Sequence, residues 1–141
     1  MRGQYQFKDG VFRCGQVNAL MALTDIGPGD GATVVVPGSH KSNFVHPQFE
    51  QLGNENGGSI GSMEGAMEVH LNKGDVLLFV DGLSHGAAAR TNPGERRVVI
   101  YRYGPTWGAS RRGYHYTDEL LNRLTPARRR ILQPVPPRFP H

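Results

Sequence analysis

The sequence is poor in cysteine and in long hydrophobic runs. Cys14 is the only cysteine among the 141 residues, so no disulfide can form within the chain, and we expect a reducing, cytoplasmic location. The longest apolar runs, residues 32–36 and 76–80, are far too short to cross a bilayer. No apolar segment typical of a secretory signal follows Met1. The sequence therefore predicts one globular domain that does not enter a membrane.

Positive charge is concentrated near the C-terminus. Residues 1–106 carry nine Lys and Arg against ten Asp and Glu, a net charge of −1, whereas residues 107–141 carry seven Arg against two acidic residues, a net charge of +5. We therefore divide the chain into a core of residues 1–106 and a basic, Pro-rich extension of residues 107–141. Arginines 128–130 lie in a helix-like stretch without interleaved aromatic residues. This pattern favours a solvated helix face over nucleic-acid binding.

The content of glycine and proline indicates a β fold. Nineteen glycines and ten prolines argue against a helical bundle and for short elements joined by tight turns. The turn sequences of residues 72–75 and 90–94 predict hairpins between the strands that flank them. Apolar and β-branched segments predict those strands at residues 14–24, 32–36, 68–71, 76–80 and 98–103. The order of elements predicts an antiparallel sandwich or jelly roll.

A helical pattern is confined to residues 116–132. Thr117 is the expected N-cap, since acidic residues follow it in the first turn. The Thr125-Pro126 pair is expected to divide the stretch into two short helices, because proline cannot continue a helix interior. The expected fold is thus mainly β with a short C-terminal helical segment.

His85 and Arg96 are the most informative pair of side chains. A hairpin with its turn between Arg90 and Thr91 would place His85 opposite Arg96, and opposed residues point to the same side of a sheet. Neutral imidazole is a good ligand for Fe(II), and two histidines with one carboxylate form the facial triad of non-haem iron oxygenases. The planar fork of arginine suits the far carboxylate of an oxo acid. The alternative is that His85 ends a strand and Arg96 is a surface charge.

Several segments match a known family in order and spacing. They are residues 23–31 (LTDIGPGDG), residues 36–43 (VPGSHKSN), the strand that follows Gly74-Asp75, His85-Gly86, and Arg96. In these segments the chain resembles the phytanoyl-CoA dioxygenase-like family of Fe(II)/2-oxoglutarate oxygenases. The resemblance implies a double-stranded β-helix, with His85 as the distal iron ligand and Arg96 as the anchor of 2-oxoglutarate. It also implies a dioxygenase that uses molecular oxygen to hydroxylate a small organic substrate, which the sequence does not identify.

One motif of this family has no counterpart in the chain. Family members take two further iron ligands from a His-x-Asp or His-x-Glu motif upstream of the PGSHK segment, and no histidine here is followed by an acidic residue at that spacing. We therefore expect the C-terminal part of an oxygenase, with a jelly roll incomplete at its N-terminus, or an inactive member, and enzyme activity stays open. Asp25, Asp30 and Asp81 are alternative oxygen ligands, although each position is typical of a turn or loop. Exposed sheet edges would favour a homodimer.

Other polar residues have weaker signals. Gln16 and Asn18 are two residues apart, so they share one face of the predicted strand. If that face lines the barrel, they contact the oxo acid or the substrate, as polar residues on the equivalent family strand do; a solvent-facing edge strand is the alternative. For His40, in the PGSHK segment, the resemblance implies a structural or substrate-side role and not a metal ligand.

A cupin-like module is the alternative reading. Gly74, Gly82 and His85 fit the offsets of the second cupin motif, but Val80 stands where that motif has proline, and the first motif is absent. The corresponding function is metal or small-molecule binding without oxygenase activity. Arg96 favours the oxygenase family, because an oxo-acid anchor has no set place in cupins. Fold does not discriminate, since both families share the double-stranded β-helix.

Overall fold

The protein is described here by a computed structural model, which covers residues 5–42, 44–48, 60–104 and 116–132. It divides into two units, Met1–Tyr103 and Gly104–His141. The second unit holds two short helices, α2 (Asp118–Asn122) and α3 (Pro126–Ile131). The first unit holds the 3-10 helices η1 (Ser39–Lys41) and η2 (Ile60–Ser62) and the strands β1 (Tyr5–Lys8), β2 (Val11–Cys14), β3 (Val17–Ala22), β4 (Thr33–Val35), β5 (Met67–Val69), β6 (Val76–Val80), β7 (His85–Ala87) and β8 (Val98–Tyr103). The expected mainly β fold is confirmed.

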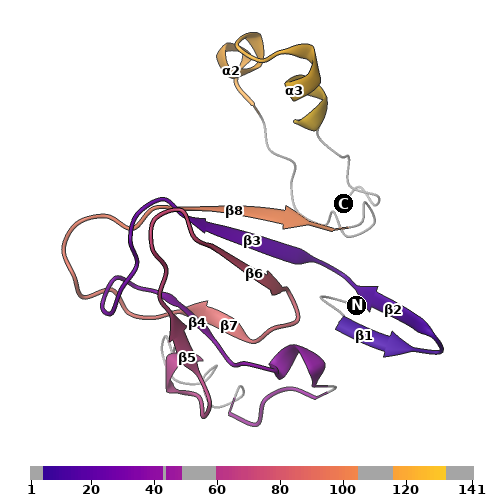
Figure 1. Ribbon diagram of the computed structural model, residues 1–141, viewed down its shortest axis with the longest axis vertical. Helices are drawn as coiled ribbons and strands as arrows, with labels where there is room; N and C mark the ends of the chain where they lie inside the picture. The colour runs from indigo at the N-terminus through magenta and orange to yellow at the C-terminus, as the bar shows by residue number, and fades with distance from the viewer. Residues whose placement is uncertain (1–4, 43, 49–59, 105–115, 133–141) are drawn as a thin grey trace. The chain divides into compact units, whose positions relative to one another are not determined.

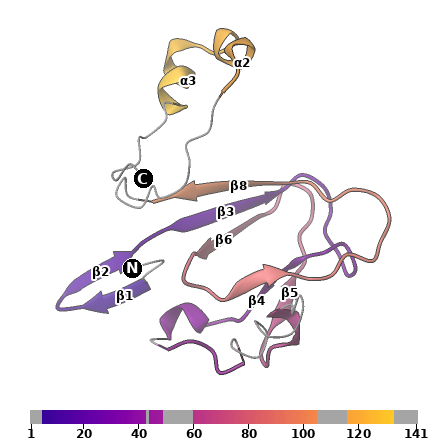
Figure 2. The ribbon, with the colours of Figure 1, turned by 180° about the vertical axis from the view of Figure 1, so that it is seen from behind.

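Two antiparallel three-stranded sheets form the body of the first unit (Figures 1 and 2). One sheet has the strand order β6-β3-β8 and the other the order β5-β4-β7, as in a jelly roll. The central strands are the most buried. Along β3 every second residue is buried, namely Asn18, Leu20 and Ala22, because successive side chains of a strand point to opposite faces. All three residues of β4 are buried.

The two hairpins predicted at residues 72–75 and 90–94 are wrong. Each turn instead carries the chain from one sheet to the other, because β6 and β8 pair with β3, whereas β5 and β7 pair with β4. His85 and Arg96 are therefore not cross-strand partners. A turn sequence specifies a local reversal of the chain, but the partner of each strand depends on which faces are buried in the core.

A separate hairpin joins β1 and β2. Its two-residue turn consists of Asp9 and Gly10, which both have positive φ, 52° and 72° respectively. This is the backbone that two-residue hairpin loops require, and Asp-Gly is among the pairs that adopt it most readily. The hairpin leads directly into β3 (Figure 1).

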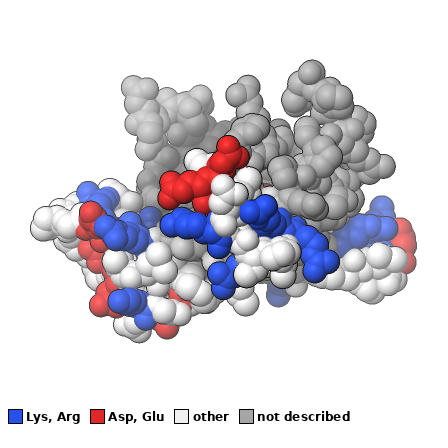
Figure 3. Space-filling model, turned by 90° about the horizontal axis from the view of Figure 1, so that it is seen from above, with Lys and Arg blue, Asp and Glu red and all other residues white. Residues whose placement is uncertain are grey.

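The predicted division into two helices and the predicted N-cap at Thr117 are confirmed. The hydroxyl of Thr117 accepts a hydrogen bond from the backbone N–H of Leu120, and that of Thr125 accepts one from Arg128, with Pro126 in the first turn of α3. Both signs of charge occur on the face drawn in Figure 3. None of the helices in the described part of the chain is long and apolar enough to cross a membrane.

Candidate functional site

His85 is the first residue of β7 and lies opposite Val35 of β4. Its Nδ1 lies 2.7 Å from the backbone carbonyl oxygen of Leu83. A carbonyl oxygen can only accept, so Nδ1 carries the proton of the neutral ring and Nε2 keeps its lone pair. The side chain is exposed, and Nε2 has no hydrogen-bond partner among the described residues. This tautomer is the one in which Nε2 can ligate a metal ion.

Phe79 connects His85 to the other sheet. The rings of Phe79 and His85 lie with their centroids 4.9 Å apart and their planes tilted by 60°. Phe79 belongs to β6 and lies opposite Asn18 of β3, so these two side chains share a face of their sheet. Asn18 is 1% exposed, which places its amide inside the unit. The ring contact therefore brings the histidine up to the inner face of β3 and β6.

Gln16 joins this inner face to the end of β6. Its Nε2 donates to Oδ1 of Asn18 at 2.8 Å and to Oδ1 of Asp81 at 3.2 Å. The backbone N–H of Asp81 also donates to the carbonyl of Gln16 at 3.1 Å. The two polar residues singled out from the sequence are thus hydrogen-bonded to each other, and a carboxylate that follows β6 completes the group.

Arg96 lies in the segment before β8 and reaches the other sheet. Its Nη2 donates to the hydroxyl of Thr33 at 3.5 Å, while its Nε is buried without a hydrogen-bond partner. Among the described residues no carboxylate lies within ion-pair distance of this guanidinium. Leaving a buried donor unpaired costs about 1–3 kcal/mol, so this arrangement favours an acceptor that comes from a ligand. A carboxylate offers two oxygens that match the guanidinium fork.

The two principal candidates reach one face of the second sheet without being strand partners. Thr33 and Val35 are two residues apart on β4 and therefore point the same way, and His85 lies opposite Val35. Arg96 touches Thr33 on that face. Both side chains thus reach the same face of the sheet through contacts with β4. The predicted hairpin would have brought them to one face by direct pairing.

The described residues do not supply a complete metal site. Across residues 5–42, 44–48, 60–104 and 116–132, no group of three His, Cys, Asp or Glu side chains could hold a metal ion. The three aspartates considered as alternative ligands accept hydrogen bonds elsewhere. Asp25 accepts from the N–H of Lys73, Asp30 from the N–H of Gly27, and Asp81 from Gln16.

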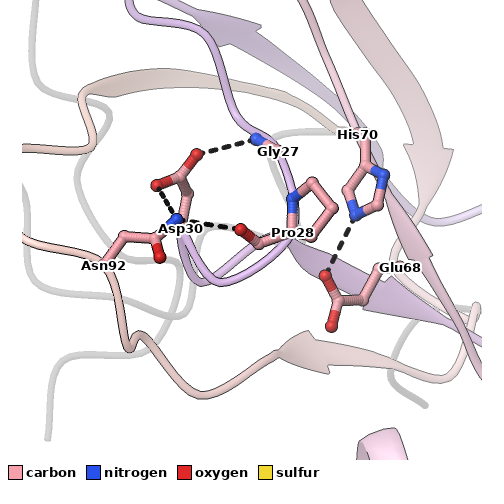
Figure 4. A network of polar contacts seen from close by, with 6 residues as sticks. All are labelled: Gly27, Pro28, Asp30, Glu68, His70 and Asn92. Atoms are coloured by element: carbon pink, nitrogen blue, oxygen red, sulfur yellow. Dashed lines mark hydrogen bonds and ion pairs between the residues drawn. The ribbon is translucent and has the colours of Figure 1, made fainter.

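Asp30 stabilises the loop that precedes β4 (Figure 4). Its Oδ2 accepts from the N–H of Gly27 at 2.8 Å and its Oδ1 accepts from Nδ2 of Asn92 at 3.0 Å, while Asn92 also donates to the carbonyl of Pro28. These bonds, the one from the Gly27 backbone first, hold the pKa of Asp30 below its usual range. Because Asn92 belongs to the loop that leads to Arg96, the network fixes that loop against the start of β4. Its role is to position the chain around the site.

The PGSHK segment lies directly beside the turn before His85. The hydroxyl of Ser39 accepts a hydrogen bond from the N–H of Ser84 at 2.8 Å, and the N–H of Val36 donates to the carbonyl of Ser84 at 3.0 Å. The ring of His40 packs edge-on against Tyr5, with centroids 4.7 Å apart. The PGSHK segment therefore holds the turn before His85 in place, whereas the ring of His40 makes a packing contact with Tyr5.

A cavity of about 1000 Å³ opens next to His85. One wall is formed by the turn of residues 81–85 and the other by the chain around η1 up to His46. This volume is at the upper end of the range typical of small-molecule sites. His85, whose Nε2 is the candidate metal ligand, thus lines a cavity large enough for an organic substrate.

Three residues of this arrangement were not among the sequence candidates: Thr33, Phe79 and Ser39. For Thr33 a signal exists, since it is a lone polar residue in the apolar run of residues 32–36. For Ser39 the signal is its place in the PGSHK segment that matches the family, whereas for Phe79 no signal in the sequence distinguishes a site residue from ordinary packing. The roles of Phe79 and Ser39 depend on contacts across 6 and 45 residues respectively, with His85 and Ser84.

Comparison with known proteins identifies relatives of this chain. The family model for phytanoyl-CoA dioxygenase (PhyH) matches residues 4–98. A protein described as dioxygenase cdmD, from Talaromyces verruculosus, is 30% identical over 111 residues, which cover 78% of this chain and 33% of that protein. The chain therefore spans about a third of this curated relative.

Solved structures of HygX from Streptomyces hygroscopicus are similar in fold and sequence. The apo and iron-bound structures are each 35% identical to this chain with a TM-score of 0.60, over 72% of this chain and 42% of HygX. A structure of HygX with nickel, 2-oxoglutarate and hygromycin B is 34% identical with a TM-score of 0.57, over 72% of this chain and 40% of HygX.

Proposed function

The chain belongs to the phytanoyl-CoA dioxygenase family, and from that premise we propose that it carries the 2-oxoglutarate-binding part of an Fe(II)/2-oxoglutarate-dependent dioxygenase that hydroxylates a small organic molecule. The observation that carries the proposal is the buried, unpaired Nε of Arg96 next to the hydroxyl of Thr33. Binding of a small molecule, 2-oxoglutarate and iron or nickel by HygX supports the same assignment. A cytoplasmic location stays a prediction from the sequence.

In this proposal different residues bind the distal carboxylate, the oxo acid or substrate, and the metal ion. Arg96 holds the distal carboxylate of 2-oxoglutarate, because its guanidinium is a planar cation, and the hydroxyl of Thr33 positions that guanidinium. Asn18 and Gln16 present amide groups to the oxo acid or the substrate. His85 offers Nε2 as a metal ligand, since Nδ1 is engaged by Leu83.

The described residues fit 2-oxoglutarate, but by themselves they do not fit an iron ion. His85 supplies one nitrogen, and no further ligand from the described part of the chain lies with it in a group of three. A single neutral imidazole does not bind iron tightly. The remaining ligands of an active centre come from outside the described residues or from another polypeptide.

The direct test is calorimetric titration of the purified chain with 2-oxoglutarate. We expect Arg96→Gln to weaken binding by roughly ten- to a hundredfold, since hydrogen bonds to charged groups contribute about 1.5–3 kcal/mol. Arg97→Gln is the matched control, because Arg97 is adjacent and exposed and pairs with Glu95. Equal affinity of the Arg96→Gln variant and the native chain would overturn the proposal.

A second candidate function is a binding module without oxygenase activity. The lack of a three-ligand group among the described residues favours it. The two candidates differ in turnover, since an oxygenase converts 2-oxoglutarate to succinate when Fe(II) and oxygen are supplied. Succinate formation that is lost in His85→Ala supports the oxygenase and contradicts the module. Binding of 2-oxoglutarate without succinate is expected of the module, and equally of an oxygenase part whose remaining iron ligands lie outside the described residues.

A further inference from the structure

Arg102 is a further arginine on the inner face of the β6-β3-β8 sheet. It lies opposite Asn18 in the register of β3 and β8, and opposed residues of an antiparallel pair point to the same side of a sheet. Phe79 lies opposite Asn18 on β6, at the other side of β3 (Figure 1). The side chains of Phe79, Asn18 and Arg102 therefore form one row across the inner face.

The guanidinium of Arg102 is available to an anion. Arg102 is exposed, and no ion pair or hydrogen bond joins its side chain to an acidic residue within the described ranges. It is also separate from the proposed 2-oxoglutarate site. The strand from Val98 to Arg102 extends over about 13 Å, so one carboxylate cannot contact both Arg102 and Arg96, which precedes the strand.

The amide of Asn18 has a fixed orientation. An ionised carboxylate only accepts hydrogen bonds, so Gln16 must present its NH2 group to Asp81, and Nε2 of Gln16 donates to Oδ1 of Asp81 at 3.2 Å. The same NH2 group donates to Oδ1 of Asn18 at 2.8 Å. Nδ2 of Asn18 has no hydrogen-bond partner among the described residues, although Asn18 is only 1% exposed. The carboxylate of Asp81 thus determines, through Gln16, that Asn18 offers N–H groups and not an oxygen.

Apolar side chains adjoin this pair of donors. Ile100 precedes Arg102 by two residues, so it lies on the same face, and it is 44% exposed. Neighbouring strands of a sheet are about 4.8 Å apart, so the backbone of Arg102 lies about 10 Å from that of Phe79. The ring of Phe79 contacts that of His85, the candidate metal ligand. A ligand held at Arg102 can therefore extend over an apolar surface toward His85.

We propose that Arg102 and the amide of Asn18 bind a free carboxylate of the substrate, and that Arg102 determines specificity for an organic acid with an apolar body. The inference rests on the function proposed above, since it names the substrate class of that site. Both groups are donors, and the planar fork of a guanidinium holds a carboxylate through two hydrogen bonds.

Other head groups match this pair of donors less well. A thioester or amide carbonyl carries no net charge and would leave Arg102 without a counter-ion. A phosphate group carries about two negative charges, which the single charge of Arg102 only half neutralises. An ammonium group would be repelled, since like charges at this distance raise the free energy of the complex.

NMR titration with probes of similar size tests the inference. The probes are hydrocinnamate, its neutral amide hydrocinnamamide, phenylpropylamine and phenylethylphosphonate. The chain is first saturated with 2-oxoglutarate, which occupies Arg96, and the shift of the Asn18 side-chain NH2 resonances reports binding. We expect hydrocinnamate to bind about tenfold or more tightly than the other three probes, and Arg102→Gln to remove this preference. Arg13→Gln, which removes an exposed arginine from β2, should retain it.

Reversal of the charge gives a second readout. Arg102→Glu, at an exposed position, should make phenylpropylamine bind more tightly than hydrocinnamate. Equal binding of hydrocinnamate and its amide by the native chain, tighter binding of the phosphonate, or a preference for the acid that survives both substitutions of Arg102 would overturn the inference.

The inference and the proposed function fail separately. A chain that binds 2-oxoglutarate through Arg96 but does not prefer the acid contradicts only the inference. If the chain does not bind 2-oxoglutarate, the probes are titrated into Arg96→Gln, in which residue 96 no longer offers a cation to hydrocinnamate. A preference for the acid that then depends on Arg102 contradicts only the proposed function.

Discussion

Thr33 accepts a hydrogen bond from the guanidinium of Arg96 at 3.5 Å, and this contact joins the central strand of one sheet to the segment that leads into the edge strand of the other. Thr33 is 6% exposed, so its hydroxyl has little access to water and depends on such a partner. The contact also places the arginine on the face of β4 that carries His85 opposite Val35. We therefore regard Thr33 as a positioning residue for Arg96.

Replacement of Thr33 by valine should separate positioning from folding. Thr33→Val keeps the shape of the side chain but removes the hydroxyl, so Arg96 loses its hydrogen bond. Because the bond is long, we expect the dissociation constant of 2-oxoglutarate to rise by roughly two- to tenfold, from a loss of about 0.5–1.5 kcal/mol. Calorimetric titration measures this, and Thr33→Ser, which retains the hydroxyl, should restore most of the affinity. Native affinity in the valine variant contradicts the assignment.

Asp30 should make the free energy of unfolding of the first unit depend on pH in the acidic range. Its pKa in the folded chain is lowered from the ordinary value of 3.8, mainly by the N–H of Gly27 and by Asn92. Folding therefore favours the ionised carboxylate, and the stabilisation is present above pH 3.8 and lost as the pH falls through the lowered pKa. We expect Asp30→Asn to be less stable at neutral pH and to lose less of its stability on acidification.

Urea denaturation across a series of acidic pH values measures this dependence. Asp9→Asn is a suitable control, because Asp9 lies in the exposed β1–β2 turn and asparagine tolerates its positive φ. If Asp30→Asn and the native chain lose stability in parallel as the pH falls, Asp30 does not contribute to this dependence.

Features that depend on near neighbours could be predicted from the sequence. Strands β6 and β8 have the predicted bounds, because β-branched, apolar and aromatic residues fill them apart from Arg102. The caps at Thr117 and Thr125 follow from hydrogen bonds to residues three positions on. The β1–β2 hairpin is not among the predicted elements, although Asp9-Gly10 is a typical turn pair.

Features that depend on distant partners could not be predicted in this way. The turn at residues 90–94 has the composition of a hairpin loop, yet it crosses between the sheets. Nothing within the turn distinguishes a hairpin from a crossover between sheets. The strand that follows the turn pairs according to which strands are buried, and these are β3 and β4, elsewhere in the chain. The same limit applies to the site: His85 and Arg96 are related through Thr33 and Val35, which lie at least 50 residues before either of them.

Gly29 should be among the least replaceable residues of the loop before β4. Its φ is +80°, and a Cβ atom there would lie 2.8 Å from both Oδ1 of Asn92 and Oγ1 of Thr91. Asn92 cannot move without losing its bonds to Asp30 and Pro28. We expect Gly29→Ala to lower the free energy of unfolding by more than the roughly 1–2 kcal/mol that a left-handed backbone costs an L-residue.

Gly10→Ala provides the comparison for Gly29→Ala. Gly10 also has positive φ, +72°, but nothing lies within 4 Å of the Cβ position, so its replacement should cost the backbone strain alone. The difference between the two variants in urea denaturation then reports the clash with Asn92 and Thr91. Equal destabilisation by both replacements would mean that Asn92 and Thr91 move away from the added Cβ atom without any loss of stability.

Self-association should depend on the outer face of the β6-β3-β8 sheet. Leu78 and Tyr101 lie on either side of Ala19 on this face, opposite to the buried side of β3, and are 68% and 51% exposed. Exposed apolar faces favour contact with a second copy of the chain, as do the outer edges of β6 and β8, which have no strand partner in the described part of the chain. We expect the average mass in light scattering to rise with concentration, and Leu78→Lys to reduce this rise. Ile131→Lys, which makes the same change at an exposed position of α3, should leave it unchanged. A native chain that stays monomeric over a wide concentration range would contradict the prediction.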